Sequence, residues 1–172
     1  MQKKLLSLFV NYNKTANNTM DGIIKTLSKE EWEKPLGGYF PSVRSICSHL
    51  YLCDFNWLKR FKNVRSFTTL DNPFFDRDNY PYSVTLFEDM EEYLGKRPDM
   101  DSRMISFVDE LTDADLDKVL KYTDPKGRNF ERNFGGCVLH FMNHDTHHRG
   151  MLSLYLEMLG RENDFNSLVQ IL

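Results

Sequence analysis

The amino-acid sequence predicts an all-α protein, an up-down four-helix bundle with a small β-hairpin before the last helix. Apolar residues recur at steps of three and four over four long segments, and a turn between two short β-prone segments precedes the last of them. The chain has 172 residues, of which 41% are hydrophobic. This length can bury one sizeable core but is too short for two full-sized domains. We therefore predict a single domain over residues 1–172.

The first two helices are predicted over residues 5–28 and 42–63. The first has one apolar face, formed by Leu5, Leu8, Phe9, Tyr12, Ala16, Met20, Ile23, Ile24 and Leu27. Residues 34–41 contain two prolines and two glycines and therefore form a loop, after which Ser42 can cap the second helix. Residues 64–82 mix aromatic residues with Asp and Pro without periodicity, which predicts a long loop.

The second half of the chain contains two more helices and the hairpin. A third helix is predicted to begin at Ser83 and to be kinked or split by Gly95 and Pro98. Residues 112–120 predict a short capped helical turn, and residues 119–123 and 128–133 predict two strands joined by 124–127. The last helix spans 134–159, Gly160 is placed to cap it, and residues 161–172 form a packed tail.

Charge and hydropathy disfavour two classes of partner. The 22 Lys and Arg residues against 25 Asp and Glu residues leave a net charge of −3, without the basic face that nucleic-acid binders show. A local basic excess at Lys59, Arg60, Lys62 and Arg65 complements a helix C-terminal dipole. No apolar segment approaches the length of a membrane span, and the N-terminus lacks the features of a signal peptide. We therefore expect no nucleic-acid or membrane partner and a cytoplasmic protein.

The five histidines occupy two places in the chain. His49 lies on the second predicted helix, whereas the other four fall within nine residues of the last one. Steps of four residues advance only about 40° around a helix, so His140, His144 and His148 form a row along one face. Two imidazoles one turn apart can bind one metal ion, and a third ligand must come from another helix. His49 is the remaining histidine and can supply it from a facing helix.

A structural interpretation competes with the metal site. An isolated pair of histidines four residues apart more often makes polar contacts on a helix surface, and His49 would then be a satisfied core histidine. The clustering of the histidines favours the metal interpretation, with His49, His144 and His148 as ligands. His147 is predicted to point outward or to lie behind a ligand, and His140 to be a spare ligand or a wall residue.

For the other residues near the predicted site, we favour a structural role over a role in metal or substrate binding. Cys47, Cys53 and Cys137 form no CxxC pair and are interpreted as reduced core thiols, although Cys53, one turn after His49, and Cys137 could approach the site. Asp145 and Asn143 are expected to be solvated. Aromatic residues could wall a substrate cavity but are usually core, and the candidates are Tyr51, Phe67, Phe74, Phe75, Tyr80 and Tyr82.

The segment from His140 to Gly150, which contains His144-Asp-Thr-His147-His148-Arg149-Gly150, resembles the DinB/YfiT-like family. The resemblance extends to the helix order, the hairpin around residues 122–127 and the Leu159-Gly160 ending, and so covers most of the chain. It implies a four-helix bundle with a metal, often nickel, zinc or iron, on His49, His144 and His148. It also implies frequent homodimers. Relatives act as metal-dependent transferases of low-molecular-weight thiols or as thiol-dependent isomerases.

Two functions remain open at this stage. One is an enzyme in which the ion generates a nucleophile for transfer of a small thiol substrate or for hydrolysis, with Arg149 or the basic end of the second helix anchoring a substrate carboxylate. The other is a non-catalytic, metal-stabilised binding or dimerisation module in stress response. The chain has Met151 where the family motif commonly has Gln, which weakens the transfer of a specific activity but touches none of the ligands.

Overall fold

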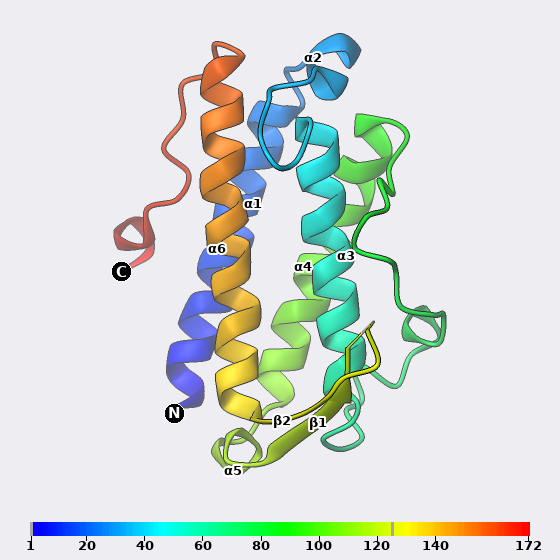
Figure 1. The fold of residues 1–172 in the computed structure, drawn as a ribbon. Helices are drawn as coiled ribbons and strands as arrows, with labels where there is room; N and C mark the ends of the chain where they lie inside the picture. Colours follow the sequence, from blue (N-terminus) through cyan, green and yellow to red (C-terminus); the bar gives the residue numbers. More distant parts are fainter. Residues whose placement is uncertain (1, 125) are drawn as a thin grey trace.

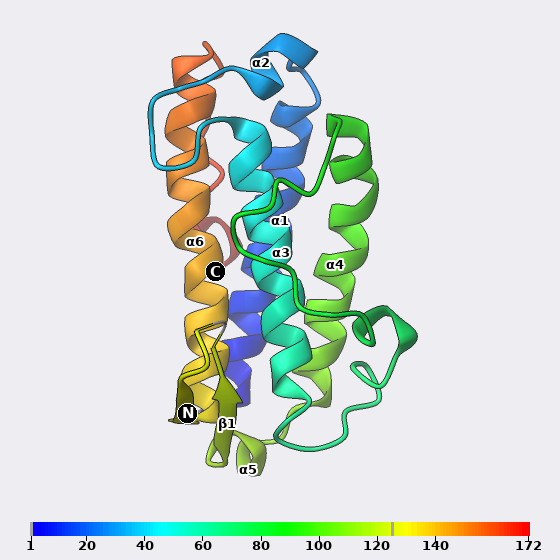
Figure 2. The same cartoon turned by 45° about the vertical axis from the view of Figure 1, so that its right-hand side comes forward.

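Four long helices run side by side in the computed structural model, which describes residues 2–124 and 126–172 (Figure 1). They are α1 (Lys3–Ile24), α3 (Val43–Phe61), α4 (Met90–Glu110) and α6 (Phe134–Met158). α1 packs against α4 and α6, and α3 packs against the same two helices, as the turned view in Figure 2 also shows. The predicted helical fold class is confirmed.

Six short elements connect or extend these helices. They are α2 (Lys29–Glu33), the 3-10 helices η1 (Pro73–Phe75) and η2 (Leu168–Ile171), α5 (Asp113–Leu116), β1 (Val119–Thr123) and β2 (Asn129–Asn133). β1 and β2 pair antiparallel, from Val119 opposite Asn133 to Thr123 opposite Asn129. Gly127 has φ +76°, a left-handed conformation that glycine adopts without strain. The predicted hairpin is therefore confirmed, except that Pro125 of its turn lies outside the described residues.

The first predicted helix was too long at its C-terminal end. α1 stops at Ile24, and the chain turns before α2 starts after Ser28. The Ser28 hydroxyl accepts a hydrogen bond from the Glu31 backbone N–H, and the Glu31 carboxylate accepts one from the Ser28 N–H. This capping box begins a new helix. Leu27 is buried although it is not helical, which explains why the apolar pattern continued past the end of α1.

The third helix was predicted to begin too early, and of the kink or split expected at Gly95 and Pro98 the split does not occur. α4 begins after Asp89, whose carboxylate accepts a hydrogen bond from the Glu92 N–H, so residues 83–89 precede the helix. α4 also continues unbroken through Gly95 and Pro98. A proline inside a helix costs roughly 3 kcal/mol. The adjacent Arg97 is buried and pairs with Asp54 and Asp101, and these contacts hold this part of α4 in place.

The predicted bounds of the two helices that carry the histidines were accurate to within two residues. Ser42 caps α3 and accepts a hydrogen bond from the Ser45 backbone N–H. Asn133 caps α6 and accepts one from the Gly136 N–H. Gly160 follows α6 with φ +76°, as expected of a residue that ends a helix. The facing positions of α3 and α6 therefore follow from local signals in the sequence.

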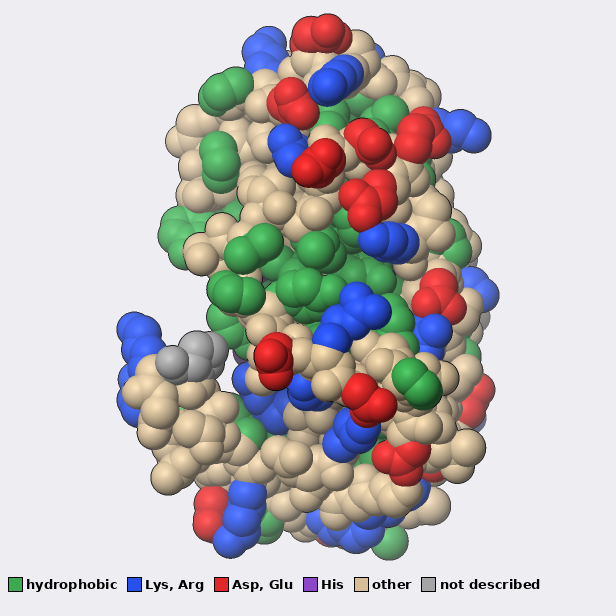
Figure 3. Space-filling model, turned by 90° about the vertical axis from the view of Figure 1, so that its right-hand side faces the viewer, with side chains coloured by type: hydrophobic (Ala, Val, Ile, Leu, Met, Phe, Trp, Pro, Cys, Tyr) green, Lys and Arg blue, Asp and Glu red, His purple; other side chains and the backbone are tan. Residues whose placement is uncertain are grey.

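Hydrophobic side chains gather midway along one face of the molecule, drawn in Figure 3, and acidic and basic side chains lie both above and below them. In the described part of the chain, none of the helices combines the length and hydropathy needed to cross a membrane.

Candidate metal centre

Three histidines of α3 and α6 lie in mutual contact. The ring centroid of His49 is 5.3 Å from that of His144 and 4.6 Å from that of His148. The rings of His144 and His148 are 4.2 Å apart, and their Nε2 atoms are 3.0 Å apart. The one-turn spacing on α6 and the packing of α6 against α3 thus bring together the three residues that the sequence singled out.

Cys53 also lies at this cluster. Its Sγ is 3.4 Å from His49 Nε2, because the two residues are one turn apart on the same face of α3. His49, Cys53 and His144 each present one donor atom, and these atoms all lie within 4.8 Å of one another, so the group could hold a metal ion. Sequence analysis favoured core packing for Cys53. The thiol is buried as expected, but it lies within reach of the site.

Burial keeps the imidazoles in the neutral form that a metal ion requires. Burial lowers the pKa of His148 to about 4, and that of His144 to about 3, where the neighbouring His148 and His49 add to the effect. Burial also lowers the pKa of His49, opposed by a hydrogen bond to the Tyr82 backbone. At neutral pH the rings therefore have free lone pairs for a cation.

The donor set fits a transition metal. The Nδ1 atom of His148 is buried without a hydrogen-bond partner among the described residues, a cost that a ligand or a bound water would remove. Imidazole and thiol donors suit zinc, iron or nickel, whereas magnesium and calcium prefer oxygen. Burial holds the pKa of the Cys53 thiol well above its usual range, so that thiol is protonated without a cation nearby.

His140 and His147 lie at the edge of the site. The ring of His140 is 6.1 Å from that of His144 and packs edge-on against Trp57, and it lines a cavity of about 440 Å³. His140 is therefore a wall residue, one of the two roles expected for it. His147 is exposed, as predicted, although its ring touches that of His148.

Phe40 covers the site from the loop before α3, and sequence analysis missed it. Its ring centroid lies 4.6 Å from that of His49 and 5.3 Å from that of His148. The Tyr155 hydroxyl of α6 donates a hydrogen bond to the Phe40 carbonyl and holds the loop. At Gly38, an added Cβ would lie 2.0 Å from the Tyr155 oxygen, so the loop approaches α6 too closely for a side chain there.

Of the aromatic residues considered as walls, Tyr82 approaches the site, with its ring 6.4 Å from that of His49. Tyr51 packs against Phe87, and Phe67 against Phe107. Phe74, Phe75 and Tyr80 surround Phe55 in the core. Most of these aromatic residues are therefore core, the interpretation that was favoured.

Two sequence predictions about polar residues of α6 were wrong. Asp145 is buried rather than solvated, and the Asn13 side-chain amide lies 3.3 Å from its carboxylate and donates to it. Arg149 is fully buried and donates to the side chains of Asn13, Asn17 and Asn166. It points into the interior against α1 and the C-terminal segment, so it cannot anchor a substrate carboxylate. Asn143 is exposed, as expected.

Two arginines at the basic end of α3 have different roles. Arg65 binds Asp115 and Glu110 and joins α3 to the segment around α5. The Arg60 guanidinium lies 4.4 Å from the Trp57 ring and 4.5 Å from the Tyr122 ring. Within residues 2–124 and 126–172, no ion pair to Arg60 is found, which leaves its charge available.

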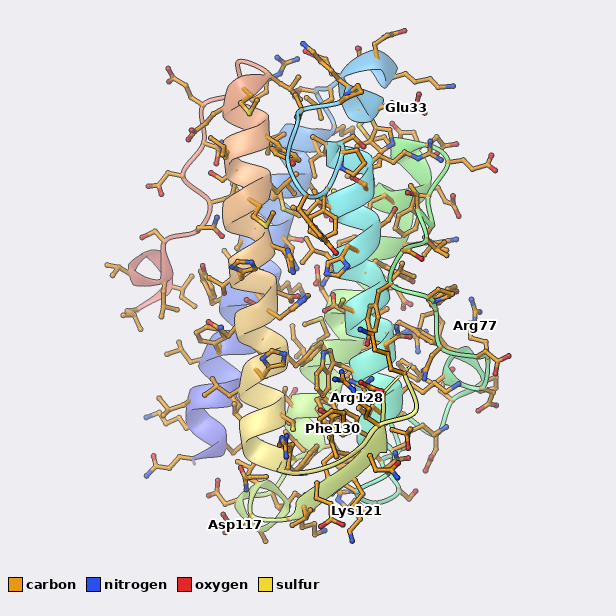
Figure 4. The ribbon with its side chains drawn as sticks, viewed as in Figure 1. Glu33, Arg77, Asp117, Lys121, Arg128 and Phe130 are labelled. Atoms are coloured by element: carbon orange, nitrogen blue, oxygen red, sulfur yellow. The ribbon has the colours of Figure 1, made fainter. Side chains whose placement is uncertain are left out.

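A cavity with a small excess of basic residues opens beside Arg60. It has a volume of about 410 Å³, and its lining includes Arg60, Tyr82, Lys126 and Arg128 together with Asp124, which pairs with Arg128. Arg128 and Phe130, both contributed by the hairpin, lie over the space between α3 and α6 in Figure 4. Tyr82 belongs both to this cavity and to the surroundings of His49, so the cavity adjoins the histidine cluster.

Comparison with known proteins identifies the family of the chain. The model of the DinB family matches residues 1–166. The chain is also similar to a curated relative, the "Protein DinB" of Bacillus subtilis (strain 168), with 26% identity over 151 residues that cover 87% of this chain and 83% of the relative. Because the family match extends over nearly the whole chain, the protein belongs to the DinB family.

Proposed function

We propose that His49, His144 and His148 bind one divalent transition-metal ion and that the protein is a metal-dependent transferase of a low-molecular-weight thiol, or a related metal-dependent hydrolase. The observation that carries this proposal is the contact among three neutral imidazoles from two helices, of which His148 is buried and His49 and His144 are half-buried. The contacts of α1 and α3 with α4 and α6 support the predicted up-down bundle as the frame of the site. Nickel, zinc and iron are the candidate ions.

The bound ion would supply Lewis-acid stabilisation of a thiolate or hydroxide at neutral pH. The protein's own residues exclude water and position the substrate. Phe40 covers His49 and His148 and keeps bulk solvent away from the donor nitrogens. A substrate carboxylate would be held by Arg60, with Lys126 adding positive charge to the cavity, while the charge of Arg128 is balanced by Asp124.

Thiol chemistry suits the site better than peptide hydrolysis. Hydrolysis by the helical zinc motif uses a glutamate next to the first ligand as general base. Here the residue after His144 is Asp145, which is buried, and burial and the nearby Asp54 raise its pKa. Its carboxyl group faces Asn13 and Asp54 in the interior, so it does not act as a base on the substrate side.

A non-catalytic metal-stabilised module is the second candidate, and the position of Cys53 favours it. A fourth protein ligand would complete a tetrahedral shell, which is typical of structural zinc sites. Under this alternative the ion stabilises the packing of α3 on α6. The homodimer that the family resemblance implies stays a prediction.

Metal analysis tests the proposal first. Purified protein is incubated with each candidate ion at neutral pH, separated from free ion and analysed for bound metal. Wild-type protein is expected to hold one ion per chain, and His144→Ala to hold far less. His147→Ala is the matched control, because His147 lies on the same helix but is exposed. Wild-type protein without bound metal under these conditions would refute the proposal.

An activity screen then separates the two candidates. The metal-loaded protein is mixed with small carboxylate-bearing thiols and electrophilic acceptors, and loss of free thiol is followed. Turnover that disappears on metal removal and in His144→Ala supports the transferase. Arg60→Met should raise KM for a carboxylate-bearing thiol more than for an uncharged one. A loaded protein without turnover, but with a raised unfolding temperature, would favour the non-catalytic module.

A further inference from the structure

Cys53 occupies a position at the site that packing alone does not require. The chain has three buried cysteines that are free of disulfides, and they lie in different surroundings. Cys47 lies on the other side of α3, near Asp21 and Tyr93, and Cys137 lines the cavity next to His140. Cys53 has its Sγ 3.4 Å from the Nε2 atom of His49.

The distance between Cys53 Sγ and His49 Nε2 matches the distance expected between two ligand atoms of one metal ion. With a metal–nitrogen bond of about 2.1 Å and a metal–sulfur bond of about 2.3 Å, a tetrahedral centre places nitrogen and sulfur about 3.6 Å apart. The observed 3.4 Å lies close to this value, and the donor atom of His144 lies within 4.8 Å of both. A weak S–H···N hydrogen bond is the alternative explanation of the contact.

His148 completes the same cluster from α6. Its Nε2 lies 3.0 Å from that of His144, and its ring packs edge-on against that of His49. His148 thus contacts the two histidines that lie near Cys53. The hydrogen-bond alternative accounts for the contact of Cys53 with His49, but it does not explain why the donor atom of His144 also lies within 4.8 Å of the thiol.

We propose that Cys53 supplies a thiolate ligand to the ion that the proposed function assigns to the three histidines, which gives a centre of three nitrogens and one sulfur. This inference rests on that metal site. On binding, the Sγ–H bond breaks, the proton passes to solvent and a sulfur lone pair forms the bond to the metal, without any change of oxidation state. The sulfur selects zinc and softer transition metals over hard cations.

The fourth ligand also constrains the chemistry at the site. A four-coordinate ion with this donor set has no open position, so a substrate thiol binds only by expanding the coordination shell or by displacing Cys53. Nickel and iron take more than four ligands more readily than a structural zinc ion does. If Cys53 is a ligand, nickel or iron would therefore favour a transferase, and zinc would favour a structural centre.

Absorption spectroscopy tests the thiolate. The reduced full-length protein is freed of small thiols under argon and titrated with Co²⁺ and Ni²⁺, while near-ultraviolet thiolate-to-metal charge transfer is recorded. We expect the band to saturate at one ion per chain. Cys53→Ser should lose the band and bind the ion more weakly, by at least the roughly 10- to 100-fold that disturbing a ligand's environment costs. Cys47→Ser and Cys137→Ser are the matched controls and should keep the band.

X-ray absorption of the loaded wild-type protein decides the question even if a cysteine variant fails to fold. One sulfur in the first coordination shell is the expected result. A bound ion surrounded by nitrogen and oxygen donors alone, without a charge-transfer band, would overturn the cysteine ligand and leave the histidine site standing. A wild-type protein that binds no ion would overturn both.

Discussion

The loop that carries Phe40 should be sensitive to substitutions at Gly38 and Tyr155. In Gly38→Ala, the new Cβ would lie 2.0 Å from the Tyr155 hydroxyl oxygen and 3.0 Å from the ring carbon that bears it. Overpacking of this kind costs typically about 1–3 kcal/mol. Tyr155→Phe removes the hydrogen bond to the Phe40 carbonyl and should cost about 1 kcal/mol.

The double variant makes the prediction specific. Removing the hydroxyl removes the closest clash, so the loss in unfolding free energy for Gly38→Ala with Tyr155→Phe should be smaller than the sum of the two single losses. Denaturant unfolding of the four proteins measures this coupling. Since Phe40 covers His49 and His148, each single variant should also release bound metal to a chelator faster than wild type. If the two losses in unfolding free energy add up and the rate of metal release is unchanged, the contact between this loop and Tyr155 is refuted.

Three further predictions concern stability. Burial raises the pKa of Asp21 from 3.8 to about 7, so the folded protein holds a proton that the unfolded chain releases, and the contribution of Asp21 to stability should fall as pH rises from about 4 to about 7, opposite to the contributions of His144 and His148. Asp21→Asn should remove this one contribution, so the difference in unfolding free energy between wild type and variant should change across that range, and a constant difference would contradict the assignment. Arg149→Met should lower the unfolding free energy by roughly 1–3 kcal/mol, because it leaves the buried amide oxygens of Asn13 and Asn17 without their donor; no measurable loss would show that these hydrogen bonds carry little stability. Ser28→Ala should cost about 1 kcal/mol by removing the α2 cap, and thermal unfolding with no shift would count against the capping box.

The helices and the histidine row could be predicted because both depend on local spacing. Three- and four-residue periodicity located α3 and α6, and the predicted capping residues Ser42 and Gly160 lie where α3 begins and α6 ends. The contact of His144 with His148 follows from a spacing of one helical turn. The contact of either with His49 required two helices to pack in one register, and the family resemblance strengthened the assignment of His49 as the third ligand.

Features that depend on long-range packing could not be predicted. Phe40 lies at the site because Tyr155, more than a hundred residues later, holds its loop. Arg149 and Asp145 are charged residues on a polar stretch of sequence, yet Asn13 of α1 binds both in the interior. The unbroken path of α4 through Pro98 likewise depends on the buried pairing of Arg97 with acidic residues of two helices.

Metal affinity of single-histidine variants tests the central claim most directly. Wild type, His49→Ala, His144→Ala, His148→Ala and the control His147→Ala are equilibrated with Ni²⁺ or Zn²⁺ against a competing chelator at neutral pH. We predict one ion per chain in wild type, a large loss of affinity in each of the first three variants and little change in the control. No bound ion in wild type, or equal affinity in all five proteins, would contradict a metal centre built on these three histidines.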